Sequence, residues 1–205
     1  VKMRKNTVGI VVTAYKINPE IVDTFFKNNQ YENIYCVTDG IVPEGVKRIQ
    51  CPDMQTFSIT RASNIGINKA IIDGFDVIIK TDIDCIISDK VMAYCEALQG
   101  NHGACWRYWH VDNADSINHA RLDKRCIGTA VMHADDWLRI NGYNEHMEGY
   151  GYDDGDLRTR ARAAGISFPT LVEPKLYHIW HEVKHNRDTI NPVNRAKNIA
   201  ARKKM

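Results

Sequence analysis

The sequence predicts an α/β fold in which a mostly parallel central sheet is flanked by helices. Short runs rich in β-branched residues, typical of buried strands, alternate along the chain with segments of helical periodicity. Polar residues follow several of these runs directly, at the positions where parallel sheets bind their ligands. Alternating strands and helices favour a parallel sheet with helices on both faces.

The first half of the chain supplies most of this pattern. Apolar runs predict strands at residues 8–15, 33–40, 46–51 and 76–87. Helical patterns predict one helix that begins at Pro19, a second over 60–72 with Thr60 as its cap, and a third over 89–98.

The second half has a different character. Strands are predicted at residues 103–109, 127–133 and 176–181, and short helices at 135–140 and 157–164. The segment 144–156 is rich in glycine, tyrosine and acid, and is predicted to be a loop. We therefore expect one domain over residues 1–183. A basic, mobile tail would follow at 184–205.

Composition excludes several classes of protein. The chain has 205 residues, 44% of them hydrophobic and 25% charged, with a formal charge of +2, which is typical of a globular domain rather than a disordered chain. The sequence contains no run of eighteen apolar residues, which a membrane span would need, and no signal peptide is recognisable in it. Six dispersed cysteines without a C-x-x-C pair favour reduced thiols, so we expect a cytoplasmic protein.

The strand predicted at 76–87 carries the first chemical signal. Asp82 and Asp84 are two residues apart, so along a strand both side chains would point to the same face. Two carboxylates buried together need a compensating charge, and Mg²⁺ or Mn²⁺ carrying a phosphorylated ligand would supply it. The alternative is a pair of solvated aspartates at a strand end.

Two further clusters could complete such a site. His178 and His181 are spaced so that both imidazoles can reach one ion, and two histidines with one or two aspartates suit Mn²⁺. A histidine taken alone is more often structural. Asp153, Asp154 and Asp156 form an acidic group that could supply a base or cap the next helix.

These motifs together give the chain a family resemblance. It resembles a GT-A-fold glycosyltransferase of the family-2 type, with a C-terminal part similar to the β-1,4-galactosyltransferases. The motifs that carry it are T-R-A-S-N-I-G at 60–66, T-D-I-D-C at 81–85, N-G-Y-N-E at 141–145, E-G-Y-G-Y-D-D-G-D at 148–156 and H-I-W-H at 178–181.

The resemblance implies a metal-dependent transfer of a sugar from a nucleotide-diphosphate donor, such as a UDP-sugar, to a hydroxyl acceptor. It also implies that the domain has a nucleotide-binding half (1–100) and an acceptor and metal half (101–183). Asp84, His178 and His181 would bind Mn²⁺ or Mg²⁺, and Asp82 would face the ribose or the water molecules around the metal. Asp154 would be the general base of an inverting reaction. The other implied contacts are nucleotide contacts at Thr13, Ala14, Tyr15, Asp39 and Arg61, and sugar contacts at Asp153, Tyr150, Gly151 and Trp109.

Several alternatives stay open at this point. A nucleotidyltransferase can share a similar sheet and a metal-binding aspartate, and a non-catalytic nucleotide- or sugar-binding module could keep the pocket without turnover. The galactosyltransferase loop has two tryptophans where this chain has Glu148 and Tyr150, so donor and acceptor identities are not carried over. The acceptor could be a glycan, a lipid-linked saccharide, a protein or, through the basic tail, a nucleic acid. The sequence indicates no oligomeric state.

Overall fold

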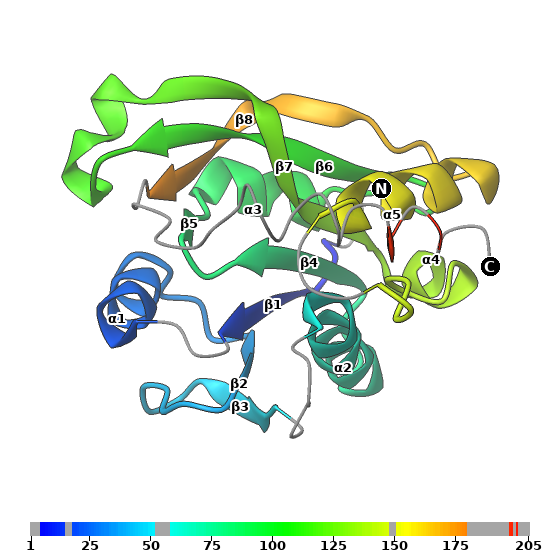
Figure 1. Cartoon of the computed structure of the whole chain (residues 1–205), viewed down its shortest axis with the longest axis horizontal. Helices are drawn as coiled ribbons and strands as arrows, with labels where there is room; N and C mark the ends of the chain where they lie inside the picture. The colour runs from blue at the N-terminus through cyan, green and yellow to red at the C-terminus, as the bar shows by residue number, and fades with distance from the viewer. Residues whose placement is uncertain are drawn as a thin grey trace.

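The protein is built on one eight-stranded sheet with the strand order β3-β2-β1-β4-β7-β6-β8-β5 (Figure 1). The structure, a computed structural model, describes residues 5–14, 18–51, 58–147, 151–179, 197, 198 and 200, without the side chains of 124–127. Within this part of the chain, no helix is both long enough and apolar enough to span a membrane.

The first half of the chain forms the parallel part of the sheet. Its strands are β1 (Val8–Ala14), β2 (Ile34–Thr38), β3 (Lys47–Gln50) and β4 (Val77–Asp82), paired in parallel. The connecting helices are α1 (Pro19–Asn28), α2 (Ile59–Ile72) and α3 (Asp89–Glu96). Strands β1 and β2 are buried along their whole length, as expected for a sheet covered on both faces.

The second half adds antiparallel pairs. Strand β7 (Arg121–His133) pairs antiparallel with both β4 and β6 (Gly103–Val111), and β8 (Thr170–Ile179) lies parallel to β6. The two-residue strand β5 (Cys85–Ile86) pairs antiparallel with the end of β8. A 3₁₀ helix, η1 (Ala114–His119), joins β6 to β7, and the remaining helices are α4 (Ala134–Arg139) and α5 (Asp153–Ala163).

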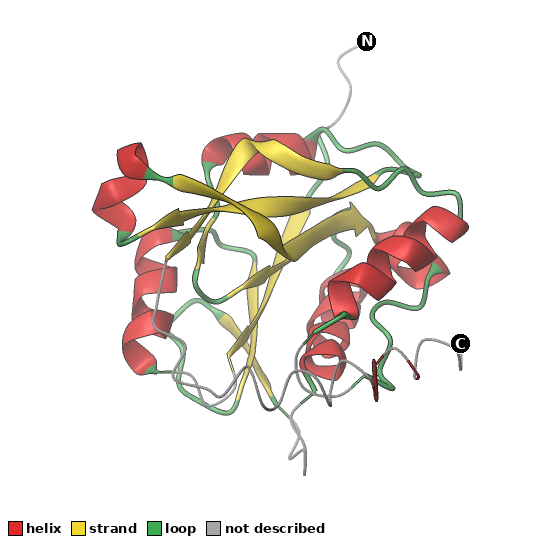
Figure 2. Cartoon of the chain, turned by 45° about the horizontal axis from the view of Figure 1, so that its top comes forward, coloured by secondary structure: helices red, strands yellow, loops and turns green. Residues whose placement is uncertain are grey.

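Helices cover both faces of the sheet (Figure 2). Helices α1 and α3 pack on one face, where Phe25 and Val91 join the larger cluster of buried apolar residues. Helices α2, α4 and α5 pack on the other face around Ile67, Trp137 and Leu157. The predicted α/β fold with helices on both faces is therefore confirmed.

Three local predictions need correction. The predicted strand 76–87 is interrupted, because β4 ends at Asp82 and Asp84 lies in a turn before β5. The cap of α2 is Ser58, whose hydroxyl accepts from the Arg61 backbone N–H, and Thr60 lies inside the helix. Helix α5 begins at Asp153, so the acids predicted in a loop occupy its first turn, where the helix dipole favours negative charge.

One described residue of the predicted tail contacts the domain. The Asn198 side chain is 1% exposed, and its amide donates to the carbonyl of Gly151 over 2.8 Å. The expectation of a mobile tail is wrong at this position, because a buried and hydrogen-bonded side chain is held in place. This contact ties residue 198 to the segment that leads directly into Asp153.

Candidate active site

The turn after β4 and the end of β8 bring an aspartate and a histidine together. Asp84 Oδ2 lies 3.1 Å from His178 Nε2, and both side chains are largely buried, at 13% and 17% exposure. The contact follows from the antiparallel pairing of β5 with β8, in which Cys85 is opposite His178. Two residues that are 94 positions apart in the sequence therefore share one site.

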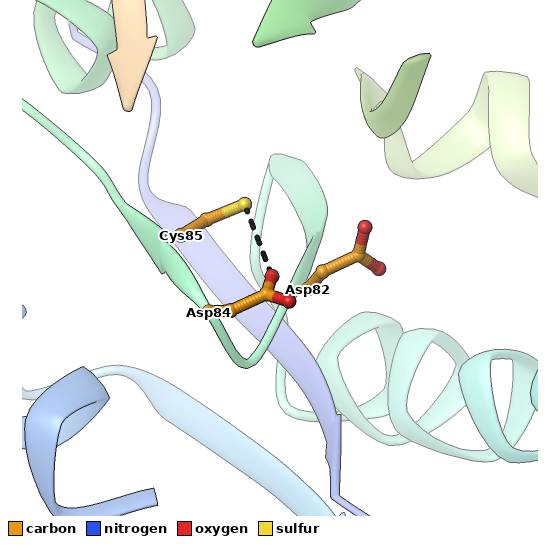
Figure 3. A group of neighbouring side chains, drawn as sticks. All are labelled: Asp82, Asp84 and Cys85. Atoms are coloured by element: carbon orange, nitrogen blue, oxygen red, sulfur yellow. Dashed lines mark hydrogen bonds between the residues drawn. The ribbon is translucent and has the colours of Figure 1, made fainter. Parts of the chain in front are cut away.

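Asp82 and Cys85 stand beside Asp84 (Figure 3). Potential ligand atoms of Asp82, Asp84 and Cys85 all lie within 4.8 Å of one another. The Cys85 thiol donates to Asp84 Oδ1 over 3.8 Å. Burial, followed by the charges of Asp84 and Asp82, raises the pKa of Cys85 well above its ordinary value, so the thiol stays protonated and is a poor metal ligand.

Both oxygens of Asp82 have hydrogen-bond donors from the protein. Lys80 Nζ donates to Oδ1 over 2.8 Å, and the Tyr108 hydroxyl donates to Oδ2 over 2.6 Å. Lys80 is fully buried, and although burial opposes its charge, the charges of Asp82, Tyr143 and Asp154 raise its pKa well above normal. Lys80 therefore provides a permanent positive charge beneath the acidic site.

A glycine makes this arrangement possible. A Cβ atom at Gly128 would lie 2.2 Å from the Tyr108 hydroxyl oxygen and 2.5 Å from Asp82 Oδ2. Only a residue without a side chain lets β7 approach the Tyr108–Asp82 hydrogen bond this closely.

The environment of His178 favours its charged form. Burial alone would lower the pKa of this imidazole, but the hydrogen bond to Asp84 and the charges of Asp84 and Asp82 raise it. The ring also stacks on Tyr108, with centroids 5.0 Å apart and an angle of 25° between the planes. In the metal-free protein, a proton between His178 Nε2 and Asp84 Oδ2 makes this contact favourable.

The first turn of α5 supplies the second acidic group. Burial, followed by the charge of Asp153, raises the pKa of Asp154 well above its ordinary value, and Lys80 only partly offsets this. The pKa of Asp153 is also raised, mainly by burial. Asp156 has a structural role instead, because its carboxylate is 1% exposed and accepts from Arg160 Nε over 2.6 Å.

Helix α2 holds the segment that leads to these acids. Asn64 Nδ2 donates to the Tyr143 carbonyl over 2.9 Å, and Asn64 Oδ1 accepts from the Tyr143 backbone N–H over 2.8 Å. The Tyr143 side chain is buried, and its ring lies below Lys80, with Nζ 5.9 Å from the centroid. The motifs at 60–66 and 141–145 therefore meet in space and fix the chain before α5.

The remaining predicted site residues are more dispersed. Thr13 and Ala14 are buried at the end of β1, with Thr13 opposite Asp82 in the register. Asp39 and Arg61 are exposed, at the end of β2 and in the first turn of α2. Their contacts with a nucleotide stay predictions.

The predicted sugar-binding residues are only partly described. Trp109 is half-buried in β6, where its indole N–H donates to the Val172 carbonyl over 3.0 Å and Lys175 lies over its ring. Gly151 precedes α5 and accepts from the Asn198 side chain. Tyr15, Tyr150 and His181 lie outside the described residues, so the second predicted histidine ligand is not placed.

Sequence reasoning missed Lys80, Gly128 and the contact of Tyr108 with Asp82. A lysine inside the apolar run 76–87 was the clearest available signal, since a fully buried lysine needs an acidic partner. The others come from strands whose pairing partners the sequence does not specify.

The described donor set fits a divalent cation. Two neighbouring ligands of an octahedral Mg²⁺ ion, each about 2.1 Å from it, lie about 3.0 Å apart. The Asp84 Oδ2–His178 Nε2 separation of 3.1 Å matches that spacing. One carboxylate and one imidazole, with a protonated thiol beside them, suit Mn²⁺ or Mg²⁺ better than a thiolate-binding metal.

Comparison with known protein families gives a match in the part of the chain that carries His178 and the acids of α5. The family model described as the N-terminal domain of galactosyltransferase matches residues 110–182, which include η1, β7, α4, α5 and β8. The match covers His178 and the acids of α5, and it ends one residue beyond His181.

Solved structures extend the likeness to nearly the whole chain. The catalytic domain of Drosophila β1,4-galactosyltransferase 7 with xylobiose has a TM-score of 0.61 at 16% identity, over 93% of this chain and 79% of that chain. A variant of the Drosophila enzyme with manganese, UDP-Gal and xylobiose has a TM-score of 0.61 at 15% identity, over 92% and 79%. GalNAc-T7 with UDP, GalNAc and Mn²⁺ has a TM-score of 0.64 at 11% identity, over 87% of this chain and 45% of that chain.

The predicted resemblance is thereby confirmed at the level of the fold. The chain has the GT-A glycosyltransferase fold, and its residues 110–182 match the galactosyltransferase family.

Proposed function

We propose that this protein is a metal-dependent glycosyltransferase that moves a sugar from a nucleotide-diphosphate donor, with UDP as the nucleotide, to a hydroxyl group of a saccharide. The observation that carries the proposal is the 3.1 Å contact between Asp84 and His178, in a fold shared with one enzyme solved with UDP-Gal and manganese and another solved with UDP, GalNAc and Mn²⁺. The xylobiose in the Drosophila complexes supports a saccharide acceptor. Nothing in the comparisons favours a nucleic acid.

Asp84 and His178 would hold Mn²⁺ or Mg²⁺ through Oδ2 and Nε2, with His181 as a further ligand. When bound, the ion neutralises the charge that develops on the departing diphosphate. Asp82, fixed by Lys80 and Tyr108, would accept hydrogen bonds from the ribose or from water around the ion. The buried Lys80 adds a second positive charge on the protein side of the site.

Asp154 is the proposed base of an inverting transfer. The acceptor oxygen forms a bond to the anomeric carbon while the bond from that carbon to the diphosphate oxygen breaks and its electron pair leaves with the diphosphate. The acceptor hydroxyl loses its proton to the Asp154 carboxylate. Its raised pKa makes this carboxylate a stronger base than an exposed aspartate.

The other predicted contacts belong to the same proposal. Thr13, Ala14, Tyr15, Asp39 and Arg61 would line the nucleotide site, and Asp153, Tyr150, Gly151 and Trp109 would contact the donor or acceptor sugar. A cytoplasmic location is also proposed, and the buried, free thiols of five described cysteines support a reducing compartment: Cys36, Cys51, Cys85, Cys95 and Cys105.

A donor-turnover assay tests the proposal. We expect the protein with Mn²⁺ to release UDP from a UDP-sugar, faster with a saccharide acceptor present. Asp84→Ala should abolish metal-dependent donor binding and turnover, whereas Asp154→Asn should keep donor binding and lose about 10²–10⁴-fold in turnover, because an amide cannot take the proton.

The matched control is Asp135→Asn, an exposed aspartate in the first turn of α4, which should behave like the wild type. Donor binding without turnover over a broad acceptor panel would refute the transferase and favour a binding module. Release of pyrophosphate rather than UDP would identify a nucleotidyltransferase instead.

A further inference from the structure

His178 has a second polar contact on the side of the ring away from Asp84. Its Nδ1 lies 3.1 Å from Nδ1 of His110, and Nε2 of His110 lies 3.1 Å from Oδ2 of Asp123. Together with the Asp84–His178 contact, these distances form a continuous chain of four side chains. Neither His110 nor Asp123 belongs to the motifs that define the site.

Three strands fix this chain. His110 of β6 is directly opposite His178 of β8 and Arg121 of β7, and Asp123 is two residues further along β7. The two imidazole rings meet edge to face, with centroids 4.8 Å apart and an angle of 89° between the planes. His110 and Asp123 are mostly buried, at 23% and 20% exposure, so water competes only weakly for their hydrogen bond.

The chemistry of the partners determines where the hydrogens lie. A carboxylate only accepts hydrogen bonds, so Nε2 of His110 carries a hydrogen and donates to Asp123. When Nε2 of His178 binds a cation through its lone pair, the hydrogen of that imidazole is on Nδ1, which then donates to Nδ1 of His110. The contacts of His110 with His178 and Asp123 therefore match the tautomer of His178 in which Nε2, the nitrogen that faces Asp84, is the ligand atom.

We propose that His110 and Asp123 are positioning residues that fix the tautomer and ring orientation of His178, so that its Nε2 lone pair is directed at the divalent cation. The inference rests on the proposed function, because it assigns a role to residues behind the same metal ligand. Partners of this kind raise the basicity of a ligating histidine and prevent its ring from flipping.

Two replacements of His110 separate positioning from packing. His110→Phe keeps an aromatic ring of similar size but has no acceptor for His178, and should weaken Mn²⁺ binding by about 10–100-fold. His110→Gln offers a carbonyl to His178 and an amide donor to Asp123, and should restore most of the affinity. His119→Phe, at an exposed histidine of η1, is the control for the substitution itself.

Mn²⁺ affinity of the full chain is measured by electron paramagnetic resonance of the free ion, with no donor or acceptor present. A long-range ¹H–¹⁵N spectrum of the metal-free protein reports which nitrogen of His110 is bare, and thermal denaturation checks that each variant is folded. The expected results are a bare Nδ1 on His110, weak binding by the Phe variant, and binding close to wild type for the Gln and control variants.

The possible failures are distinguishable. If the wild type binds Mn²⁺ and a folded His110→Phe binds it equally well, the inference is wrong and the proposed function stands. A hydrogen on both nitrogens of His110, or a Gln variant as weak as the Phe variant, also overturns it. If the Phe variant does not fold, the Gln variant and the nitrogen spectrum decide. A wild type that binds no Mn²⁺ overturns both proposals.

Discussion

Replacing Lys80 by methionine should destabilise the protein through one identifiable charge. The Lys80 side chain is 2% exposed, and its ammonium lies 2.8 Å from Asp82 Oδ1. Methionine has a similar length and no charge, so it leaves the packing nearly intact and removes the cation. Asp82 then stays near two other carboxylates, Asp153 and Asp154, without its counter-charge.

The size of the effect follows from the exposure of the partner that remains. Removing one member of a buried ion pair costs about 3–5 kcal/mol. The Asp82 side chain is 29% exposed, so water can solvate part of its charge and the lower end applies. A loss of about 3 kcal/mol corresponds to a fall in Tm of about 6–12 °C in a domain of this size.

The assay is thermal denaturation of the metal-free protein at neutral pH, with Asp82→Asn and the double variant completing a cycle. The double variant should lose less stability than the sum of the singles, by about 1 kcal/mol or more, because no unpaired charge is left. Lys69→Met is the control, because Lys69 is half-exposed in its ion pair with Asp73. This substitution should lower the free energy of unfolding by less than about 1 kcal/mol. An unchanged Tm for Lys80→Met, or strict additivity, would refute the reasoning.

Three further predictions concern the same site. Gly128→Ala places a methyl group 2.2 Å from the Tyr108 hydroxyl. It should therefore lower the free energy of unfolding, measured by urea denaturation, by about 1–3 kcal/mol and weaken Mn²⁺ binding. An unchanged free energy of unfolding and an unchanged Mn²⁺ affinity would contradict the close approach. The raised pKa of Asp154 means that folding favours its acid form, so the metal-free protein loses stability as pH rises through that pKa. Asp154→Asn, which stays neutral, should therefore raise Tm at neutral pH. A lower Tm would contradict this. Turnover needs the carboxylate, so the rate should rise with pH through the pKa of Asp154. Asp153→Asn removes a charge that raises this pKa and should move the acid limb of the rate profile to lower pH; a shift to higher pH would contradict the assignment.

The first half of the fold was predictable because buried parallel strands have an unmistakable composition. Strands β1 and β2 are apolar, β-branched and covered on both sides. The second half was harder, because β7 extends through polar residues from Arg121 and β8 contains Pro174. A proline normally argues against a strand, and here the β6–β8 register is irregular between Leu171 and Leu176.

The site was predictable in its residue types and only partly in its geometry. The D-x-D spacing pointed to Asp82 and Asp84, but the argument from strand alternation was wrong because Asp84 lies in a turn. Its meeting with His178 depends on β5 pairing with β8, which no local pattern specifies. The contacts of His110 with His178 and Asp123 join three strands, so no sequence pattern could predict them.

Ligand-dependent stabilisation tests most directly whether Asp84 and His178 share a cation that carries the donor. Tm is measured with UDP-, GDP- and CDP-sugars, each with and without Mn²⁺, for the wild type and for Asp84→Asn. At about 100 times Kd, a ligand adds about 2.7 kcal/mol, equivalent to about 5–11 °C here. We predict that a UDP-sugar with Mn²⁺ stabilises the wild type more than either component alone, and that Asp84→Asn loses this extra shift. Equal shifts without Mn²⁺, or an undiminished shift in Asp84→Asn, would contradict the account.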